Sequence, residues 1–301
     1  MNPLRVAPIL LAIVVSAPAD AAIDPALLDL APPGAKVLCG IQVQQALSSP
    51  FGQFLLSRMP GNGATLLGFA AATGFDPRRD LREVLLAGSA APGNGNDGVL
   101  LARGTFQIEK LIALAATIHA SNANYAGVPL ITPAEPRAPT IAILDSSTIA
   151  IGSESAVKSV IDRRAARLAF SGPLADKAQA ASASGDAWVA TVTPLAALVP
   201  ANTGSFPVTF VQAVIESSAG LRFDAGGVTL SAEALTHSVN EAEGLVTVLK
   251  FVAGMVKGPQ GAALQGAQFA SSGPVTRITL TIPEQDLERA FPATPQGRAA
   301  R

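Results

Sequence analysis

The stretch Ala35–Leu47, AKVLCGIQVQQAL, has the pattern of a short buried strand that leads directly into the start of a helix. A second stretch with the same plan, DAWVATVTPLAAL, occupies Asp186–Leu198. Laid together, the stretches match Val37, Cys39 and Ile41 with Trp188, Ala190 and Val192, and Ala46-Leu47 with Ala197-Leu198. The shared plan predicts an internal duplication, in which each half of the chain begins with one of these stretches.

The elements that follow each stretch come in the same order, although the loops differ in length. In the first half we expect strands at 83–90, 98–104, 140–145 and 147–153, and helices at 51–59, 64–74, 107–120 and 154–165. In the second half we expect strands at 220–224, 228–234 and 275–283, and helices at 210–218, 241–256 and 284–291. Strands that come in pairs joined by short turns favour antiparallel sheets. We therefore predict an α+β fold of two similar units, each a mainly antiparallel sheet with helices packed on one face.

Composition shifts along the chain suggest where these units begin and end. The stretch around 170–186 is rich in small and polar residues, as linkers are, and the final residues contain Pro and Arg without an apolar period. The predicted organisation is a signal peptide at 1–21, a first α+β unit at 22–170, a linker at 171–185, a second α+β unit at 186–292 and a disordered tail at 293–301.

The N-terminus has the order of a secretory signal peptide. Arg5 supplies an early positive charge, an apolar run follows from Val6 to Val15, and small residues end at Ala19-Asp20-Ala21. This run is shorter than the roughly 20 residues that a membrane-spanning helix needs. We expect cleavage after Ala21 or Ala22, export to the periplasm or beyond, and a soluble mature chain without a membrane span.

Charge and cysteine content narrow the classes of partner. Charged residues make up 14 % of the chain and the formal net charge is -1, so no basic face is expected and nucleic acid is not an expected partner. The single cysteine, Cys39, cannot form an intramolecular disulfide, and its place in an apolar strand predicts a core position.

Two short motifs resemble functional sequences but have simpler explanations. GNGNDG at Gly93–Gly98 fits a dinucleotide-binding pattern, but that pattern requires a helix after the glycines, whereas a strand is expected here. SAVK at Ser155–Lys158 fits a penicillin-binding motif, but the other motifs of that site are misplaced. We expect instead that Ser153 or Ser155 caps a helix and that the glycines form a turn.

Histidines and carboxylates lack the spacing of metal or catalytic sites. The two histidines, His119 and His237, have no His, Cys or paired carboxylate at ligand spacing, and no G-x-S-x-G elbow accompanies them. We therefore expect no catalytic residues, no cofactor and no metal.

Charges gather between Gly74 and Ala90, in GFDPRRDLREVLLAGSA. Asp76-Pro77 is a typical helix start, which favours a structural interpretation in which the charges lie on a solvated turn before a strand. The alternative is a partner-contact site formed by Arg78, Arg79, Asp80 and Arg82.

This segment, with DGVLLARGTF and YAGVPL after it, resembles a pattern in uncharacterised exported bacterial proteins, secreted or periplasmic. In that pattern G-x-D-P-x-x-D precedes a strand and Y-x-G follows a helix; the resemblance covers Ala35 to Ile161. It implies an exported α+β protein and assigns no catalytic residues.

We therefore expect a non-catalytic exported protein, a binding or interaction module of the cell envelope or periplasm. Its partner would be a protein, another envelope component or a small apolar ligand. Two alternatives remain open at this point: an exported hydrolase with dispersed catalytic residues, and a structural or assembly protein of the envelope.

Overall fold

The computed structural model describes residues 22–50, 52–53, 73–89, 98–117, 120–135, 138–198, 212–224, 226–256, 258, 261, 264 and 266–286. The strands are β1 Val37–Gln42, β2 Leu81–Gly88, β3 Val99–Gly104, β4 Ser121–Tyr125, β5 Val128–Thr132, β6 Thr140–Asp145, β7 Thr148–Gly152, β8 Ala187–Thr191, β9 Val214–Asp224, β10 Gly227–Thr236, β11 Gln268–Ser272 and β12 Val275–Pro283. The helices are α1 Pro25–Leu28, α2 Val43–Ser48, α5 Pro77–Asp80, α6 Ile108–Thr117, α7 Glu154–Ala166, α8 Pro173–Ser184, α9 Leu195–Leu198 and α11 Val239–Met255.

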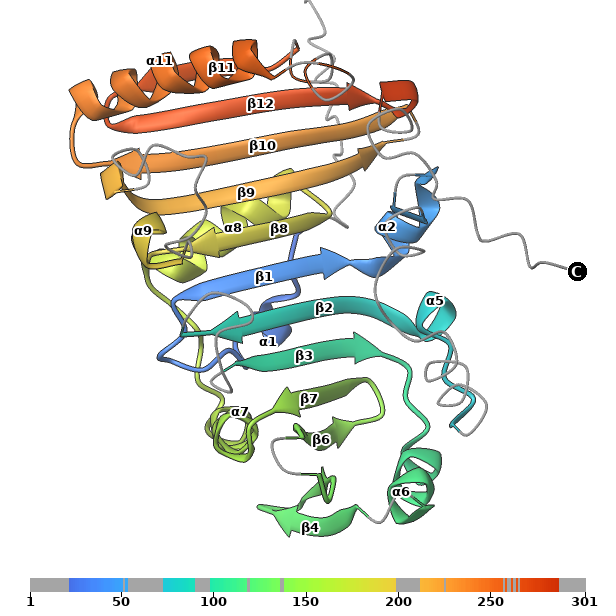
Figure 1. Cartoon of the computed structure of the whole chain (residues 1–301). Coiled ribbons are helices and arrows are strands. Elements are labelled where there is room, and N and C mark those ends of the chain that lie inside the picture. The colour runs from blue at the N-terminus through green and yellow to red at the C-terminus, as the bar shows by residue number, and fades with distance from the viewer. Residues whose placement is uncertain are drawn as a thin grey trace, which may run out of the picture.

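All these strands belong to one 12-stranded antiparallel sheet, which confirms the predicted α+β class (Figure 1). The strand order is β11-β12-β10-β9-β8-β1-β2-β3-β7-β6-β5-β4. The two stretches with the shared plan pair with each other in the middle of this order, where Val37 lies opposite Thr191 and Ile41 opposite Ala187. A single sheet therefore runs through both halves of the chain, whereas a separate sheet in each unit was predicted. The prediction that helices pack on one face of each sheet is also wrong, because α6 packs against Ile131 and Ile143 and α7 packs on the other face against Ala142 and Ala150.

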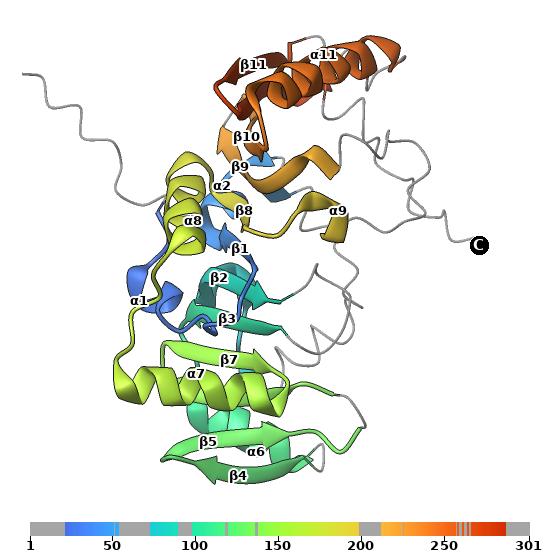
Figure 2. The ribbon, with the colours of Figure 1, turned by 90° about the vertical axis from the view of Figure 1, so that its left-hand side faces the viewer.

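The main core lies on the sheet face that carries α1, α7 and α8 (Figure 2). We call it the α8 face. Its centre is formed by alternate residues of neighbouring strands, because side chains on a strand point to opposite faces in turn. These are Leu38, Leu85, Leu101 and Trp188, each at most 5 % exposed. Gly40 makes room for the Trp188 ring, since a Cβ at this position would lie 2.4 Å from it.

Helix α11 packs on the opposite face, against β10, β11 and β12. There the hydroxyl of Thr276 donates to the carbonyl of Ala242 at 3.2 Å, and Thr276 is fully buried. α11 has 17 residues, and nowhere in the described part of the chain is a helix both long and apolar enough to cross a bilayer.

Two helix starts agree with the sequence analysis. Asp76 caps α5, and Ser153 caps α7 by accepting from the Ala156 amide at 3.3 Å. α11, expected from Glu241, begins two residues earlier at Val239, and Ser238 is its cap. Of the two serines considered for α7, the cap is therefore Ser153.

Other elements differ from the prediction. The expected helix 210–218 is wrong from Val214 onward, because Val214 begins the 11-residue strand β9, which is paired on both sides. The expected linker 171–185 contains α8, which buries Leu174, Ala175, Ala178 and Ala181. Hairpin β4–β5 and strand β11 were not predicted. Cys39 is half-buried rather than a core residue, because it points to the face opposite Leu38, and burial raises the pKa of its thiol.

Several predicted segments lie outside the described residues: the signal peptide 1–21, the helix 51–59 except for its second and third residues, most of the helix 64–74, most of GNGNDG, and the tail 293–301. The proposed unit boundaries and the duplication stay predictions.

Candidate functional site

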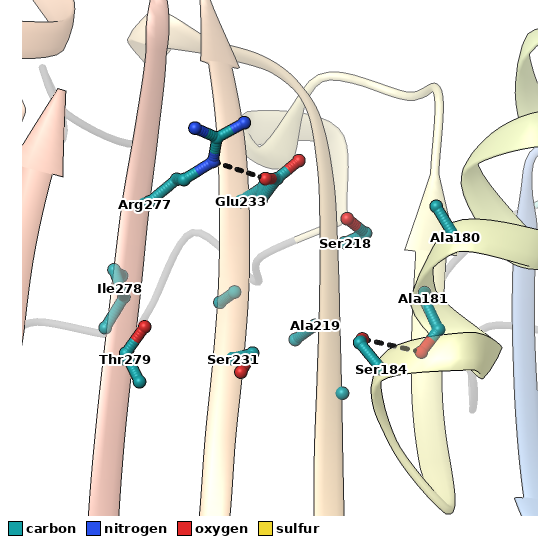
Figure 3. A pocket seen from close by; sticks show the side chains of 12 residues that line it. Ala180, Ala181, Ser184, Ser218, Ala219, Ser231, Glu233, Arg277, Ile278 and Thr279 are labelled. Atoms are coloured by element: carbon teal, nitrogen blue, oxygen red, sulfur yellow. Dashed lines mark hydrogen bonds and ion pairs between the residues drawn. The ribbon is translucent and has the colours of Figure 1, made fainter. Parts of the chain in front are cut away.

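Among the described helices, none covers the α8 face beyond α8, and a groove of about 300 Å³ begins there (Figure 3). We call it the α8 groove. One side is the C-terminal half of α8, with Ala180, Ala181 and Ser184, and the floor is the sheet. The floor residues come from β9, β10 and β12, and they include Ser218, Ser231, Glu233, Arg277 and Thr279.

Strand register brings these floor side chains together. Glu233 lies opposite Ser218 on one neighbouring strand and opposite Arg277 on the other. Two residues earlier on β10, Ser231 lies opposite Gly220 and Thr279. Cross-strand neighbours point to the same face, so hydroxyls and one charge pair lie side by side on the floor, among small apolar residues that make up much of the lining.

Gly220 lets α8 approach the sheet closely at this point. A Cβ on Gly220 would lie 2.8 Å from the Ser184 hydroxyl oxygen and 3.2 Å from the Ala181 carbonyl oxygen. The Ser184 hydroxyl is itself engaged, since it donates to that carbonyl at 2.8 Å. The wall of the groove is thus fixed by a glycine on the strand and by small residues on the helix.

One ion pair sets the electrostatics of the groove. Arg277 Nε lies 2.6 Å from Glu233 Oε1, and this hydrogen bond raises the pKa of Arg277. Both side chains are about half exposed, so the pair is well hydrated. The groove therefore offers hydroxyl donors and acceptors, and its charges balance. Such a groove is suited to bind a polar molecular surface rather than a single ion.

The charge cluster singled out from the sequence forms a local network away from this groove. Asp76 accepts from the Arg78 amide at 3.0 Å, and Asp80 accepts from the Asp76 amide at 2.8 Å. Arg79 binds the Asp80 carboxylate at 2.7 Å, and this contact lowers the pKa of Asp80. Arg82 is exposed at the start of β2. A partner-contact role for Arg78, Arg79, Asp80 and Arg82 stays a prediction.

The histidine candidates are not brought to the groove. His237 Nδ1 lies 3.2 Å from Glu241 one helical turn away, and both side chains are exposed. The nearby Ser238 hydroxyl accepts from the Glu241 amide, as a helix cap does. His119 lies outside the described residues. Within the described ranges, no group of three or more His, Cys, Asp or Glu side chains could hold a metal ion.

The most perturbed acid of the described chain was missed by the sequence analysis. Glu83 is 5 % exposed, and burial raises its pKa to about 7, although a hydrogen bond from Gln42 at 2.9 Å opposes the shift. It lies on the same face as Leu85 and Ala87, because the three alternate along β2. That alternation was visible in the sequence and would have identified Glu83 as buried.

No family model matches the chain, and no curated protein sequence matches it. Solved structures with a similar fold include three crystal forms of TP0453, a protein of Treponema pallidum. Forms I, III and IV give TM-scores of 0.52, 0.55 and 0.52, with 11 %, 11 % and 12 % sequence identity. The matches cover 89 %, 89 % and 91 % of this chain and 96 %, 97 % and 98 % of the TP0453 chain. The chain is therefore similar in fold to TP0453 over most of the length of both.

Proposed function

We propose that this is a non-catalytic exported protein of the bacterial envelope or periplasm, which binds a partner protein through the α8 groove. The observation that carries the proposal is the change in the α8 face at Ser184. On one side of this point the face is buried under helices. On the other side no described helix covers it, and it carries hydroxyls and an ion pair.

The chemistry of the groove favours a protein surface over a small apolar ligand. Sites for small molecules are mostly apolar and enclosed, whereas this floor presents Ser218, Ser231, Thr279 and an ion pair. The three floor strands are 11, 10 and 9 residues long, so they supply a broad surface. Polar interfaces of this kind are common in complexes that form and separate.

The order of strands supports the proposed internal duplication. Outward from β1 the order is β2, β3, β7 and β6, and outward from β8 it is β9, β10, β12 and β11. In each case a hairpin is added beside the third strand, β6–β7 in the first half and β11–β12 in the second; β11–β12 comes after α11, whereas β4 and β5 come between α6 and β6. The hairpin β4–β5 is then an addition to the first unit alone.

In-cell photocrosslinking tests the binding proposal. A photoreactive amino acid at Ser231 is expected to give an adduct with one envelope protein, and Ser218→Tyr is expected to abolish it by filling the groove. Thr281→Tyr is the matched control, because Thr281 is exposed on the same face and does not line the groove. An adduct that survives Ser218→Tyr would show that the contact lies elsewhere.

An exported hydrolase is the alternative, and the pair of His237 and Glu241 is the observation behind it. A hydrolase would need an activated hydroxyl beside this histidine, and the Ser238 hydroxyl already caps α11. A fluorophosphonate probe is expected to leave the purified protein unlabelled. Labelling that His237→Ala abolishes would support the hydrolase instead.

A further inference from the structure

A buried carboxylate lies beside the point where the mature chain is expected to begin. Both carboxylate oxygens of Glu83 are 3.4 Å from the Asp24 amide nitrogen. The preceding residue, Ile23, is 3 % exposed and packs in the main core. The first residues after the expected cleavage site are therefore held against Glu83.

Negative charge exceeds positive charge around Glu83. Arg103 lies opposite Glu83 on β3, but its guanidinium forms an ion pair with the Asp24 carboxylate. On the other side, Gln42 separates Glu83 from Asp186, a buried acid that accepts from the Phe223 amide at 2.7 Å. Arg82, which precedes Glu83 on β2, lies at a β-bulge and is exposed. Among the described residues, the carboxylates of Glu83 and Asp24 thus share the guanidinium of Arg103, whose Nε is buried without a hydrogen-bond partner.

A carboxylate buried without its own cation is costly, because burial removes the water that stabilises its charge. The pKa of Glu83 is accordingly raised to about 7. A cation placed against this group would lower that pKa and stabilise the folded chain at neutral pH.

We propose that the α-ammonium group created by cleavage after Ala22 binds the Glu83 carboxylate, so that removal of the signal peptide supplies the missing cation. In this step a signal-peptidase-type protease uses one water to hydrolyse the Ala22–Ile23 amide. The leaving segment keeps the new carboxylate, and the Ile23 amine takes up a proton at neutral pH. The inference rests on the export part of the proposed function.

Chain geometry brings the new group within reach. The Ile23 nitrogen precedes the Asp24 nitrogen by one residue, roughly 3.5 Å of chain, and the Asp24 nitrogen already contacts Glu83. Cleavage after Ala21 would place the amine one residue further away, on the exposed Ala22. Of the two sites that the sequence allowed, the proposal therefore requires cleavage after Ala22.

The proposal fixes the sign of a pH effect. In the uncleaved chain the folded pKa of Glu83, about 7, exceeds the ordinary value of 4.5. The stability of the uncleaved chain is therefore greatest, as far as Glu83 is concerned, below pH 4.5, and it declines as the pH rises through 7. In the cleaved chain the ammonium group holds Glu83 ionised, so this decline is smaller.

The test compares two forms of the protein, one that begins at Ile23 and one that carries Gly-Ser before Ile23. Each form is made with the natural Glu83 and with the Glu83→Gln substitution, which gives four proteins. All four are released from a fusion in vitro, so the result does not depend on export or on the groove. Urea unfolding is followed by the fluorescence of Trp188, the single tryptophan. At pH 7 the Ile23 chain is expected to have an unfolding constant about fivefold below that of the extended chain, as a fall of one unit in the pKa of Glu83 from about 7 implies.

Glu83→Gln is expected to remove this difference, and equal pH profiles for the Ile23 and Gly-Ser chains would overturn the proposal. NMR titration of the amine in the Ile23 chain with the natural Glu83 gives a second measurement. It does not depend on whether the Glu83→Gln variant folds. The pKa of this amine is expected to lie above the usual 7.7–8.0 of a free amine. A value within that range would equally rule out the ion pair.

Discussion

The α8 face differs between the part that described helices cover and the part that no described helix covers, which we call the bare region. Over β1, β2, β3 and β8, the α8 face carries Leu38, Leu85, Leu101 and Trp188, all buried. Over β9, β10 and β12 the same face carries Ser218, Ser231, Glu233, Arg277 and Thr279. The strands pair without interruption across this change, so backbone hydrogen bonding does not distinguish the two regions.

The two regions therefore differ in their side chains and not in the hydrogen bonding of their strands. An antiparallel sheet can bury one part of a face and expose another, provided that the exposed part is polar. Substitutions that remove volume from the covered region should lower the stability of the protein. Substitutions in the bare region should affect partner binding and leave stability nearly unchanged.

The largest effect is expected in the covered region, for Leu85→Ala. Leu85 is 0 % exposed at the centre of the core, and truncation of such a side chain leaves a cavity that costs about 2–5 kcal/mol. Urea unfolding followed by Trp188 fluorescence measures the loss. Thr279→Ala, on the bare region of the same face, is the control and should change stability by less than about 0.5 kcal/mol. Similar losses for both variants would remove the distinction.

A smaller loss is expected when volume is added to the covered region by Gly40→Ala. The new methyl would lie 2.4 Å from the Trp188 ring, so the ring must move. Overpacking of this kind costs about 1–3 kcal/mol, and the emission of Trp188 should shift. Gly34→Ala is the matched control, because a Cβ there meets no atom within 4 Å. An unchanged emission spectrum for Gly40→Ala would contradict the tight packing.

Alternation and helix capping predicted the covered region well. The pattern of β1 and β8 identified Val37 and Trp188 as strand residues, and the two strands are adjacent in the sheet. Caps at Asp76 and Ser153 were visible as helix starts followed by Pro or an acid. Strand alternation and helix caps depend on residues that are close in the sequence, so they can be recognised in a single sequence.

The elements that border the groove could not be predicted in this way. α8 buries mainly Ala175, Ala178 and Ala181, whose small side chains give little periodic contrast and resemble those of a linker. β9 begins with residues that were read as the end of a helix, and pairing on both sides fixes it as a strand. The groove itself joins residues from Ala180 to Thr279, which only the sheet order brings together.

In the bare region, Arg277→Ala is expected to change stability only slightly. The partner in its ion pair, Glu233, is 49 % exposed, and exposed ion pairs contribute about 0–1 kcal/mol. The variant should nevertheless weaken crosslinking through Ser231, because it leaves Glu233 uncompensated at the partner surface. Arg222→Ala is a control that removes one arginine from the same face outside the groove lining. A loss of stability comparable to that of Leu85→Ala would show that the bare region is part of the core.

The smallest effect is expected for the combined replacement of Arg78, Arg79 and Arg82 by alanine. The variant keeps the Asp76 cap and removes one exposed ion pair, Arg79–Asp80, so the unfolding free energy should fall by less than about 1 kcal/mol. Crosslinking through Ser231 should be unchanged, because these arginines lie outside the groove lining. If the variant unfolds normally but loses the adduct, the partner must reach from the groove to α5. The charge cluster would then be a second contact site, and the bare region of the α8 face would be only part of the binding surface.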